Sequence, residues 1–263
     1  MATSLSKMLA VLELFDEDHP TWTVDDVCVR LQLSASSGYR YVRELTAVGL
    51  LNRLTGGVYV LGPRVVELEY VMRTSDPVGK VGRPILERLS EATGCDALLS
   101  NIYGLHIINL LHVRGVEELD VTYTRGRQHP LFRGAVAKSI LPFLSRSQLV
   151  KIHQAHQVEI AHAGLGDDWL PFWRHLQAIK RQGFVESRGE LDPGIHGLGM
   201  PVLVDGAVIG SVTLVYSPDR ARVLNRDGLL EQMRLACGSL GVAIQAFASQ
   251  QPESGASAPL RPS

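Results

Sequence analysis

The strongest structural signal in this sequence is a pair of capped helices separated by a short turn. Thr23 stands three positions before Asp26, a pattern typical of a helix start capped by a side chain. A second helix is expected after Ser34, another N-cap residue, and Gly49 is expected to end it. Apolar residues recur at helical spacing along the two helices, at Val24, Val27, Cys28 and Leu31 and at Tyr39, Val42, Leu45 and Val48. Two helices joined in this way predict a helix-turn-helix unit.

The segments on either side complete the unit. Residues 4–15 carry apolar side chains at helical spacing and predict an amphipathic helix, which the acidic stretch 16–20 ends. After the second helix, two β-prone runs flank Thr55-Gly56-Gly57, a strong signal for a hairpin. Three helices followed by a hairpin predict a winged helix-turn-helix over residues 1–62.

Charge is distributed unevenly along this region. Residues 27–64 contain five arginines and one glutamate, a net charge of +4, whereas residues 13–26 contain six carboxylates and no lysine or arginine. The whole chain of 263 residues has a net charge of −1, so any DNA contact must be a local patch. Small hydroxyl side chains permit close approach to the duplex, and arginine is the commonest reader of guanine. The candidate DNA-contacting residues are Ser34, Ser36, Ser37, Tyr39, Arg40, Arg43, Arg53 and Thr55.

The remainder of the chain predicts a linker helix and a second domain. Pro63 at a helix start predicts a helix over 63–75. Residues 76–79 are expected to end this helix, and another helix is expected over 80–93. Hairpin signals lie at 103–104 and 205–206. A further strand is expected at 119–126, helices at 133–144, 146–156 and 167–182, and a last helix containing Leu229, Met233, Ala236, Leu240 and Ile244. Hairpin-paired strands with helices grouped around them predict an α+β fold with an antiparallel sheet.

Both halves of the chain resemble the IclR family of bacterial transcription regulators. The DNA-binding half is similar in SLSKMLAVLELF, TVDDVCVRLQLSASSGYRYVRELTAVGLL and GVYVLGPRVVEL, although Ser37 stands where the family usually has threonine. The second half is similar in GELDPGIHGLGMPVLVDGAVIGSVTLVYSP, with Glu190, Gly194, Pro201 and Val202 matching. The resemblance covers residues 4–248 and implies a linker helix over 63–76, a GAF-like effector-binding and oligomerisation domain over 77–249, and a tail over 250–263. That tail is rich in Pro, Ser and Gly and is expected to be disordered.

A ligand pocket is expected at the start of the helix near Gly134. Free backbone amides at a helix start favour a carboxylate, and Arg133 is a candidate to pair with it. The resemblance implies that Gly134, Ala135, Ser187, Gly197, Leu214 and Tyr216 also line the effector site, and His196 lies beside it. Because Gly197, Leu214 and Tyr216 replace residues that are often polar or Cys in the family, an aromatic or cyclic carboxylate is the expected effector.

The expected protein is a cytoplasmic regulator, not an enzyme, that binds a palindromic operator in double-stranded DNA as a homodimer or a dimer of dimers. No cofactor, metal or membrane partner is expected. His153, His156 and His162 have a spacing that a metal site could use, but solvated histidines are the favoured interpretation. Two alternatives stay open: a DNA-binding regulator without a ligand, favoured if Leu214 and Tyr216 fill the pocket, and an enzyme or redox sensor using Cys95.

Overall fold

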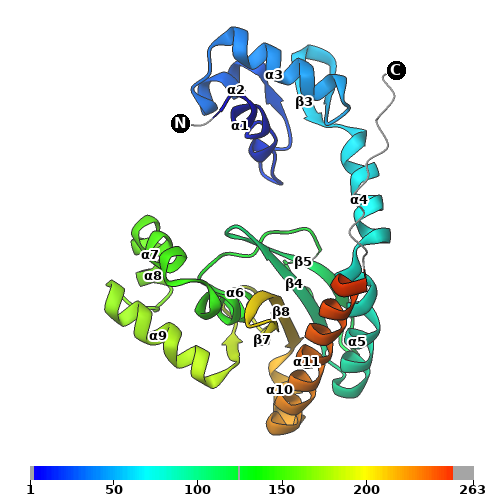
Figure 1. The fold of residues 1–263 in the computed structure, drawn as a ribbon, viewed down its shortest axis with the longest axis vertical. Helices are drawn as coiled ribbons and strands as arrows, with labels where there is room; N and C mark the ends of the chain where they lie inside the picture. Colours follow the sequence, from blue (N-terminus) through cyan, green and yellow to red (C-terminus); the bar gives the residue numbers. More distant parts are fainter. Residues whose placement is uncertain (1–2, 124, 251–263) are drawn as a thin grey trace. The chain divides into compact units, whose positions relative to one another are not determined.

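The computed structural model describes residues 3–123 and 125–250 of the chain. These form two compact units that divide between Asp76 and Pro77, and each is described by itself (Figure 1). The tail expected over 250–263 lies, apart from its first residue, outside the described residues.

Three α-helices, two 3-10 turns and a small sheet build residues 4–61 of the first unit. Thr23 caps α2, since its hydroxyl accepts a hydrogen bond from the Asp26 amide, and Ser34 caps α3 through the Ser37 amide. Both predicted caps are therefore confirmed, as is Gly49, which follows α3 with a positive φ of 75°. The elements are α1 (Ser4–Leu9), η1 (Leu12–Leu14), β1 (Trp22–Thr23), α2 (Val24–Leu31), α3 (Ala35–Ala47), β2 (Leu51–Arg53), η2 (Thr55–Gly57) and β3 (Val58–Leu61).

Packing modifies the first predicted helix. The helix expected over 4–15 ends at Leu9, and a 3-10 turn follows. This break lets Val11 become fully buried among the side chains of α2 and α3, so tertiary packing overrides the helical pattern.

The apolar face of α3 also differs from the expectation. Val42 and Leu45 are buried, but Tyr39 and Val48 are exposed and Tyr41 is buried instead. A spacing of three residues drifts around a helix of 3.6 residues per turn, so residues at the two ends of the series leave the core stripe.

The predicted hairpin is present and gains a third strand. β2 and β3 pair in antiparallel fashion around η2, where Gly56 and Gly57 have positive φ values. The short strand β1 pairs with the other edge of β3, giving the order β1-β3-β2. The unit is thus a winged helix-turn-helix.

Two consecutive helices meet at the boundary of the units in the sequence, α4 at the end of the first unit and α5 at the start of the second. α4 (Pro63–Ser75) has Pro63 in its first turn, as predicted, and none of its residues is buried. α5 (Pro77–Thr93) begins three residues earlier than expected, because only Asp76 leaves the helical conformation. A residue before proline is pushed to extended backbone, while proline itself suits a helix start.

The second unit is built on a five-stranded antiparallel sheet with the order β5-β4-β8-β7-β6. Its strands are β4 (Asp96–Tyr103), β5 (His106–Val113), β6 (Val185–Arg188), β7 (His196–Val204) and β8 (Ala207–Tyr216). Both predicted hairpins are confirmed, whereas β6 was not predicted. The strand expected over 119–126 is wrong for the residues that the structure describes. Residues 119–123 form a loop, which the Asn109 side chain holds by donating to the Tyr123 carbonyl oxygen at 2.6 Å, and Arg125 forms only an isolated bridge with Asn109.

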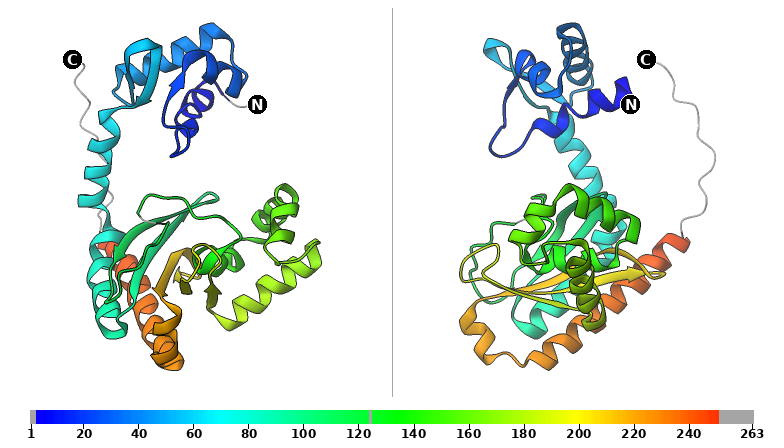
Figure 2. Two further views of the ribbon diagram at one scale, coloured as in Figure 1. Left: turned by 180° about the vertical axis from the view of Figure 1, so that it is seen from behind. Right: turned by 90° about the vertical axis from the view of Figure 1, so that its left-hand side faces the viewer.

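Helices cover both faces of this sheet. α5 and α11 (Arg226–Gln250) lie along one face, and α6 (Gly134–Ile140) lies on the other (Figures 1 and 2). Beyond α6, a separate small core around the fully buried Phe172 joins the next helices. The remaining elements are η3 (Leu141–Phe143), α7 (Arg146–Ala155), α8 (Gln157–His162), α9 (Trp169–Gln182) and α10 (Pro218–Val223). The α+β class with an antiparallel sheet and flanking helices is therefore confirmed.

Candidate functional site

A groove in the first unit lies between the exposed face of α3 and the wing. The lining residues are Ser36, Tyr39, Arg40, Arg43, Thr46, Ala47, Arg53 and Tyr59. Five of the eight candidate DNA-contacting residues are therefore brought together here. Thr46, Ala47 and Tyr59 were missed, although Thr46 lies three and seven positions beyond Arg43 and Tyr39, the spacing of residues that share a helix face.

The other three candidates lie outside this groove. Ser34 and Ser37 bond to each other at the start of α3, with 3.0 Å between their hydroxyl oxygens. Thr55 lies in the turn of the wing. These three positions remain predictions as DNA contacts.

The arginines of the groove are held only weakly by the protein. An Arg43 guanidinium nitrogen lies 3.1 Å from a Glu44 carboxylate oxygen, and both side chains are exposed. The Arg40 guanidinium carbon lies 5.2 Å from the centre of the Tyr41 ring. Exposed ion pairs contribute little stability, so either guanidinium can exchange its contact for a phosphate or a base.

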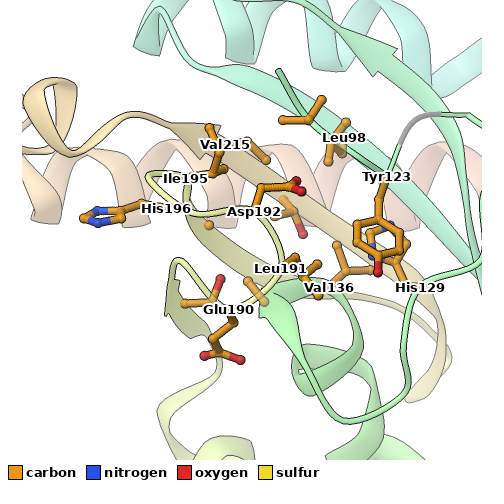
Figure 3. A pocket seen from close by; sticks show the side chains of 15 residues that line it. Leu98, Tyr123, His129, Val136, Glu190, Leu191, Asp192, Ile195, His196 and Val215 are labelled. Carbon is orange, nitrogen blue, oxygen red and sulfur yellow. The ribbon is translucent and has the colours of Figure 1, made fainter. Parts of the chain in front are cut away.

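A pocket in the second unit lies between the sheet, the start of α6 and the loop 189–195 (Figure 3). Four expected effector-site residues, Ala135, Ser187, His196 and Gly197, line it. The others are Leu98, Val121, Tyr123, His129, Val136, Glu190, Leu191, Asp192, Ile195, Thr213 and Val215. Most were not predicted, because the loops that carry them are placed by contacts distant in sequence.

The helix start at Gly134 is already occupied by a side chain of the protein. The Gly134 amide donates to Glu190 Oε2 at 2.9 Å, and Lys138 Nζ lies 2.6 Å from Glu190 Oε1. The Arg133 guanidinium donates to the backbone carbonyl oxygen of Glu190 and does not line the pocket. Glu190 therefore takes the position that was expected for an effector carboxylate.

Gly134 itself meets a strict backbone requirement. Its φ is 80°, and a Cβ there would lie 2.6 Å from Leu191 Cδ1. The left-handed conformation requires glycine, and a Cβ would in addition displace the Leu191 side chain.

Two expected pocket residues belong to the opposite face of the sheet. Leu214 and Tyr216 lie in the core under α5 and α11, while their neighbours Thr213 and Val215 line the pocket. Successive side chains of a strand point to opposite faces of the sheet. An assignment that is displaced by one residue along β8 therefore selects side chains on the wrong face. Leu214 and Tyr216 consequently do not fill the pocket.

His129 combines burial with an incomplete set of hydrogen bonds. It is 3% exposed, and its Nε2 lies 3.0 Å from Asn109 Oδ1, whereas no described group bonds to Nδ1. Burial lowers the pKa of His129 to about 4, although the nearby Asp192 carboxylate opposes this shift. The imidazole is therefore neutral at pH 7.

The other candidate chemistry is not assembled. The expectation of a solvated histidine is wrong for His153, which is buried against Trp169 and Phe172, whereas His156 bonds to Glu159 at 2.9 Å. Within residues 3–123 and 125–250, no three His, Cys, Asp or Glu residues are grouped to hold a metal ion. Cys95 is buried and burial raises its thiol pKa, the opposite of what a reactive thiol needs.

None of the described helices combines the length and the apolar character needed to cross a membrane.

Comparison with known proteins gives the same family for both units. Residues 4–54 match the family model of the IclR helix-turn-helix domain, and residues 72–240 match that of the bacterial transcriptional regulator IclR C-terminal domain.

Individual relatives agree with these matches. The HTH-type transcriptional regulator KipR of Bacillus subtilis is 26% identical over 74% of this chain and 78% of its own length. The Pca regulon regulatory protein of Pseudomonas putida is 22% identical over 81% of this chain and 73% of its own. Both are named as regulators, in agreement with the expectation that the chain is not an enzyme.

Solved structures share the fold. An IclR transcriptional regulator from Silicibacter sp. TM1040 has a TM-score of 0.75 and 22% identity, covering 92% of this chain and 96% of its own. An IclR homologue from Microbacterium hydrocarbonoxydans, complexed with 4-hydroxybenzoate, has a TM-score of 0.68 and 21% identity, covering 93% and 100%.

Proposed function

The chain belongs to the IclR family of bacterial transcriptional regulators, and we propose where it binds its two partners. The groove of the first unit binds duplex operator DNA. The pocket of the second unit binds a small organic effector, and its occupancy changes the affinity for the operator.

The observation that supports the DNA site is the convergence of three arginines on a single groove. Arg40 and Arg43 come from α3 and Arg53 from β2 of the wing, while Ser36 lines the same groove near the start of α3. In helix-turn-helix proteins the second helix enters the major groove. We therefore assign Arg40 and Arg43 to base or phosphate contacts, and Arg53 to the phosphate backbone beside the wing.

The pocket supports an effector with a ring. Apolar side chains from five different segments, including Leu98, Val136 and Val215, offer walls to an aromatic or cyclic body. We retain an organic acid as the effector class, but its carboxylate is assigned different partners. Ser187 and Thr213, which carry hydroxyl groups, are among the lining residues, whereas the Gly134 amide is bonded to Glu190.

Self-association is proposed from the linker helix. Val66, Tyr70 and Val71 of α4 are all exposed, and no residue of α4 is buried. A second copy that covers this helix would remove apolar area from water and present two recognition helices to the two half-sites of a palindrome.

The experiment begins with the full chain and a pool of random DNA duplexes. Repeated selection is expected to yield a palindromic sequence that is bound much more tightly than shuffled DNA at constant salt. Aromatic and cyclic acids are then titrated against the protein, with thermal unfolding and operator affinity as readouts. A ligand that binds the folded state raises the melting temperature, and by linkage must change operator affinity if it acts as effector.

Each part of the proposal can fail separately. Absence of any enriched sequence would overturn the operator assignment. A ligand that stabilises the protein without changing operator affinity would overturn the effector role and favour a regulator that acts without a ligand.

A further inference from the structure

A second cleft of the second unit lies on the other face of the sheet, between the strand ends, α10 and the start of α11. Arg188, His196 and Tyr216 form a row along its wall, since Arg188 of β6 pairs with His196 of β7, and His196 pairs with Tyr216 of β8. Residues paired in this way direct their side chains to the same face. His196 also borders the proposed effector pocket, but Figure 3 shows its ring directed away from the other labelled side chains. The second cleft is therefore separate, and its volume of about 390 Å³ is usual for a small-molecule site.

Positive charge predominates in this cleft. Its lining contains three arginines, Arg188, Arg222 and Arg226, and a single carboxylate, that of Glu186. One Glu186 oxygen lies 2.6 Å from Arg226 Nε, and the other lies 3.7 Å from a guanidinium nitrogen of Arg188. Arg222 pairs with Asp219 outside the lining, where both side chains are exposed and solvent screens the pair. Because one carboxylate cannot neutralise three guanidinium groups, the cleft attracts a further anion.

The Tyr216 hydroxyl adds a donor without a partner to this charged wall. Only 8% of Tyr216 is exposed, because its ring belongs to the core that the sheet forms with α11. The hydroxyl makes no hydrogen bond with any described residue, and it is not one of the fully buried polar atoms. It therefore meets open space, and the space that Tyr216 lines is this cleft.

The charges around the Tyr216 phenol agree with this position. Burial raises the pKa of Tyr216 and Glu186 raises it further, whereas Arg188 and Arg226 lower it. The phenol is thus protonated at pH 7 and can donate a hydrogen bond to an anion held by the same two arginines.

These donors suit a phosphate group better than a carboxylate. Arg226 uses only its Nε on Glu186, which leaves both terminal nitrogens of its guanidinium group to donate. Guanidinium groups bind phosphate in a bidentate manner. A phosphate monoester offers three acceptor oxygens and a charge of about −1.5 to −2 at pH 7, enough to contact two guanidinium groups and a phenol together. A carboxylate offers two oxygens and one charge.

The rest of the lining indicates the body of the ligand. Leu198 of β7, Leu224 after α10 and Leu229 of α11 give the cleft an apolar wall beside the charged one. A ligand that covers this wall needs an apolar body.

We propose that this cleft binds a phosphate monoester with an apolar body, whose phosphate contacts Arg188 and Arg226 and accepts a hydrogen bond from the Tyr216 hydroxyl. The site is distinct from the proposed effector pocket, so the chain binds a second small molecule on the opposite face of the same sheet. Glu186 lies between the two arginines and competes with the phosphate for them.

Phenyl phosphate is the probe, titrated against the full chain by calorimetry at low salt, with phenol as the matched compound that lacks the phosphate. Phenyl phosphate is expected to bind saturably and phenol at least about tenfold more weakly. Tyr216→Phe keeps the buried ring and is expected to weaken binding of phenyl phosphate about tenfold, the effect of one hydrogen bond to a charged group. Tyr103→Phe is the matched control, because Tyr103 is an exposed tyrosine of the same unit outside the cleft, and unchanged affinity is expected.

Substitutions of the charged residues are expected to change the affinity in opposite directions. Arg188→Gln is expected to weaken binding about threefold to tenfold, whereas Glu186→Gln removes the competing carboxylate and is expected to strengthen it by a similar factor. Arg234→Gln is the control for the loss of an arginine, since Arg234 is exposed on α11 outside the cleft, and it is expected to leave the affinity unchanged. Damage to the fold cannot strengthen binding, so Glu186→Gln remains decisive if thermal unfolding shows that Tyr216→Phe does not fold.

Three results would overturn the proposal. The first is the absence of saturable binding of phenyl phosphate, and the second is equally tight binding of phenol. The third is binding that Arg188→Gln does not weaken and Glu186→Gln does not strengthen, because the ligand then occupies another site, such as the arginine groove of the first unit. None of these results bears on the proposed operator or effector functions, which are tested by other ligands.

Discussion

Gly38 of α3 lies directly against the thiol of Cys28 in α2. A Cβ placed on Gly38 would be 2.2 Å from Cys28 Sγ, far inside van der Waals contact, and 3.9 Å from Cys28 Cβ. The two helices of the helix-turn-helix therefore cross at Gly38. How closely α3 can approach α2 there depends on the size of the side chain at position 28.

This contact predicts that a substitution at Cys28 compensates for a larger residue at position 38. Gly38→Ala alone is expected to destabilise the first unit by about 1–3 kcal/mol through overpacking, although alanine is the better helix former. Cys28→Ala removes Sγ, so the double variant is expected to recover that loss and retain the helical gain of up to about 1 kcal/mol. Hydrogen exchange of the α2 and α3 amides measures both effects. Equal protection in Gly38→Ala and wild type would contradict the overpacking.

Arg40 allows a test of the DNA-contacting groove. Arg40→Ala is expected to weaken operator binding by about 1–3 kcal/mol if the guanidinium reads a base. Arg30→Ala is the matched control, since it removes the same charge from the same unit at a position outside the groove lining. Operator affinities measured at several salt concentrations distinguish a base contact from a phosphate contact. Loss of a phosphate contact lowers the slope of log affinity against log salt concentration by about 1. If the two variants weaken operator binding equally, Arg40 contributes only its general positive charge and makes no specific contact.

His129 predicts an acid-sensitive second unit. Its pKa is about 4 when folded, below the ordinary value of 6.5, so between these values the unfolded chain binds a proton that the folded chain does not. Stability from this group is fully present above about pH 6.5 and decreases as the pH falls toward 4, by at most about 3 kcal/mol. Urea unfolding at several pH values measures this slope. His129→Phe is expected to show a shallower slope, and parallel curves for the two proteins would exclude the effect.

Lys138 and Glu190 are expected to be strongly coupled. Their side chains are only 12% and 30% exposed, so removal of either leaves the other charge partly desolvated and without its partner. Glu190→Gln and Lys138→Met are each expected to cost about 1–3 kcal/mol, and the double variant less than the total of the two. A double-mutant cycle on thermal unfolding of the second unit measures the coupling. If the losses of stability in the two single variants add exactly in the double variant, the Lys138–Glu190 pair is screened by solvent and the predicted coupling is absent.

Features encoded within a few residues could be predicted from the sequence. The caps at Thr23 and Ser34 and the turn at Asp205-Gly206 each depend on neighbours within about four positions, and all three are present.

Features that depend on distant partners were missed. β6 is a strand because β7 pairs with it, and the start of α6 is closed by Glu190, more than fifty residues further along the chain. The assignment of Leu214 in place of Thr213 failed for a different reason: both residues suit a buried strand, and only the packing of the two faces distinguishes them.

The two faces of β4 and β8 have a mechanical consequence. Leu98, Thr213 and Val215 line the pocket, while the adjacent Leu99 and Leu214 pack in the core with α5 and α11. Close-packed interiors compress little, so a ligand that pushes these strands outward transfers its displacement to the helices behind them. α5 is joined to α4 through Asp76 alone. Within the second unit the sheet is thus a stiff partition, with the proposed effector pocket on one face and, on the other, α5, the helix that follows α4 in the sequence.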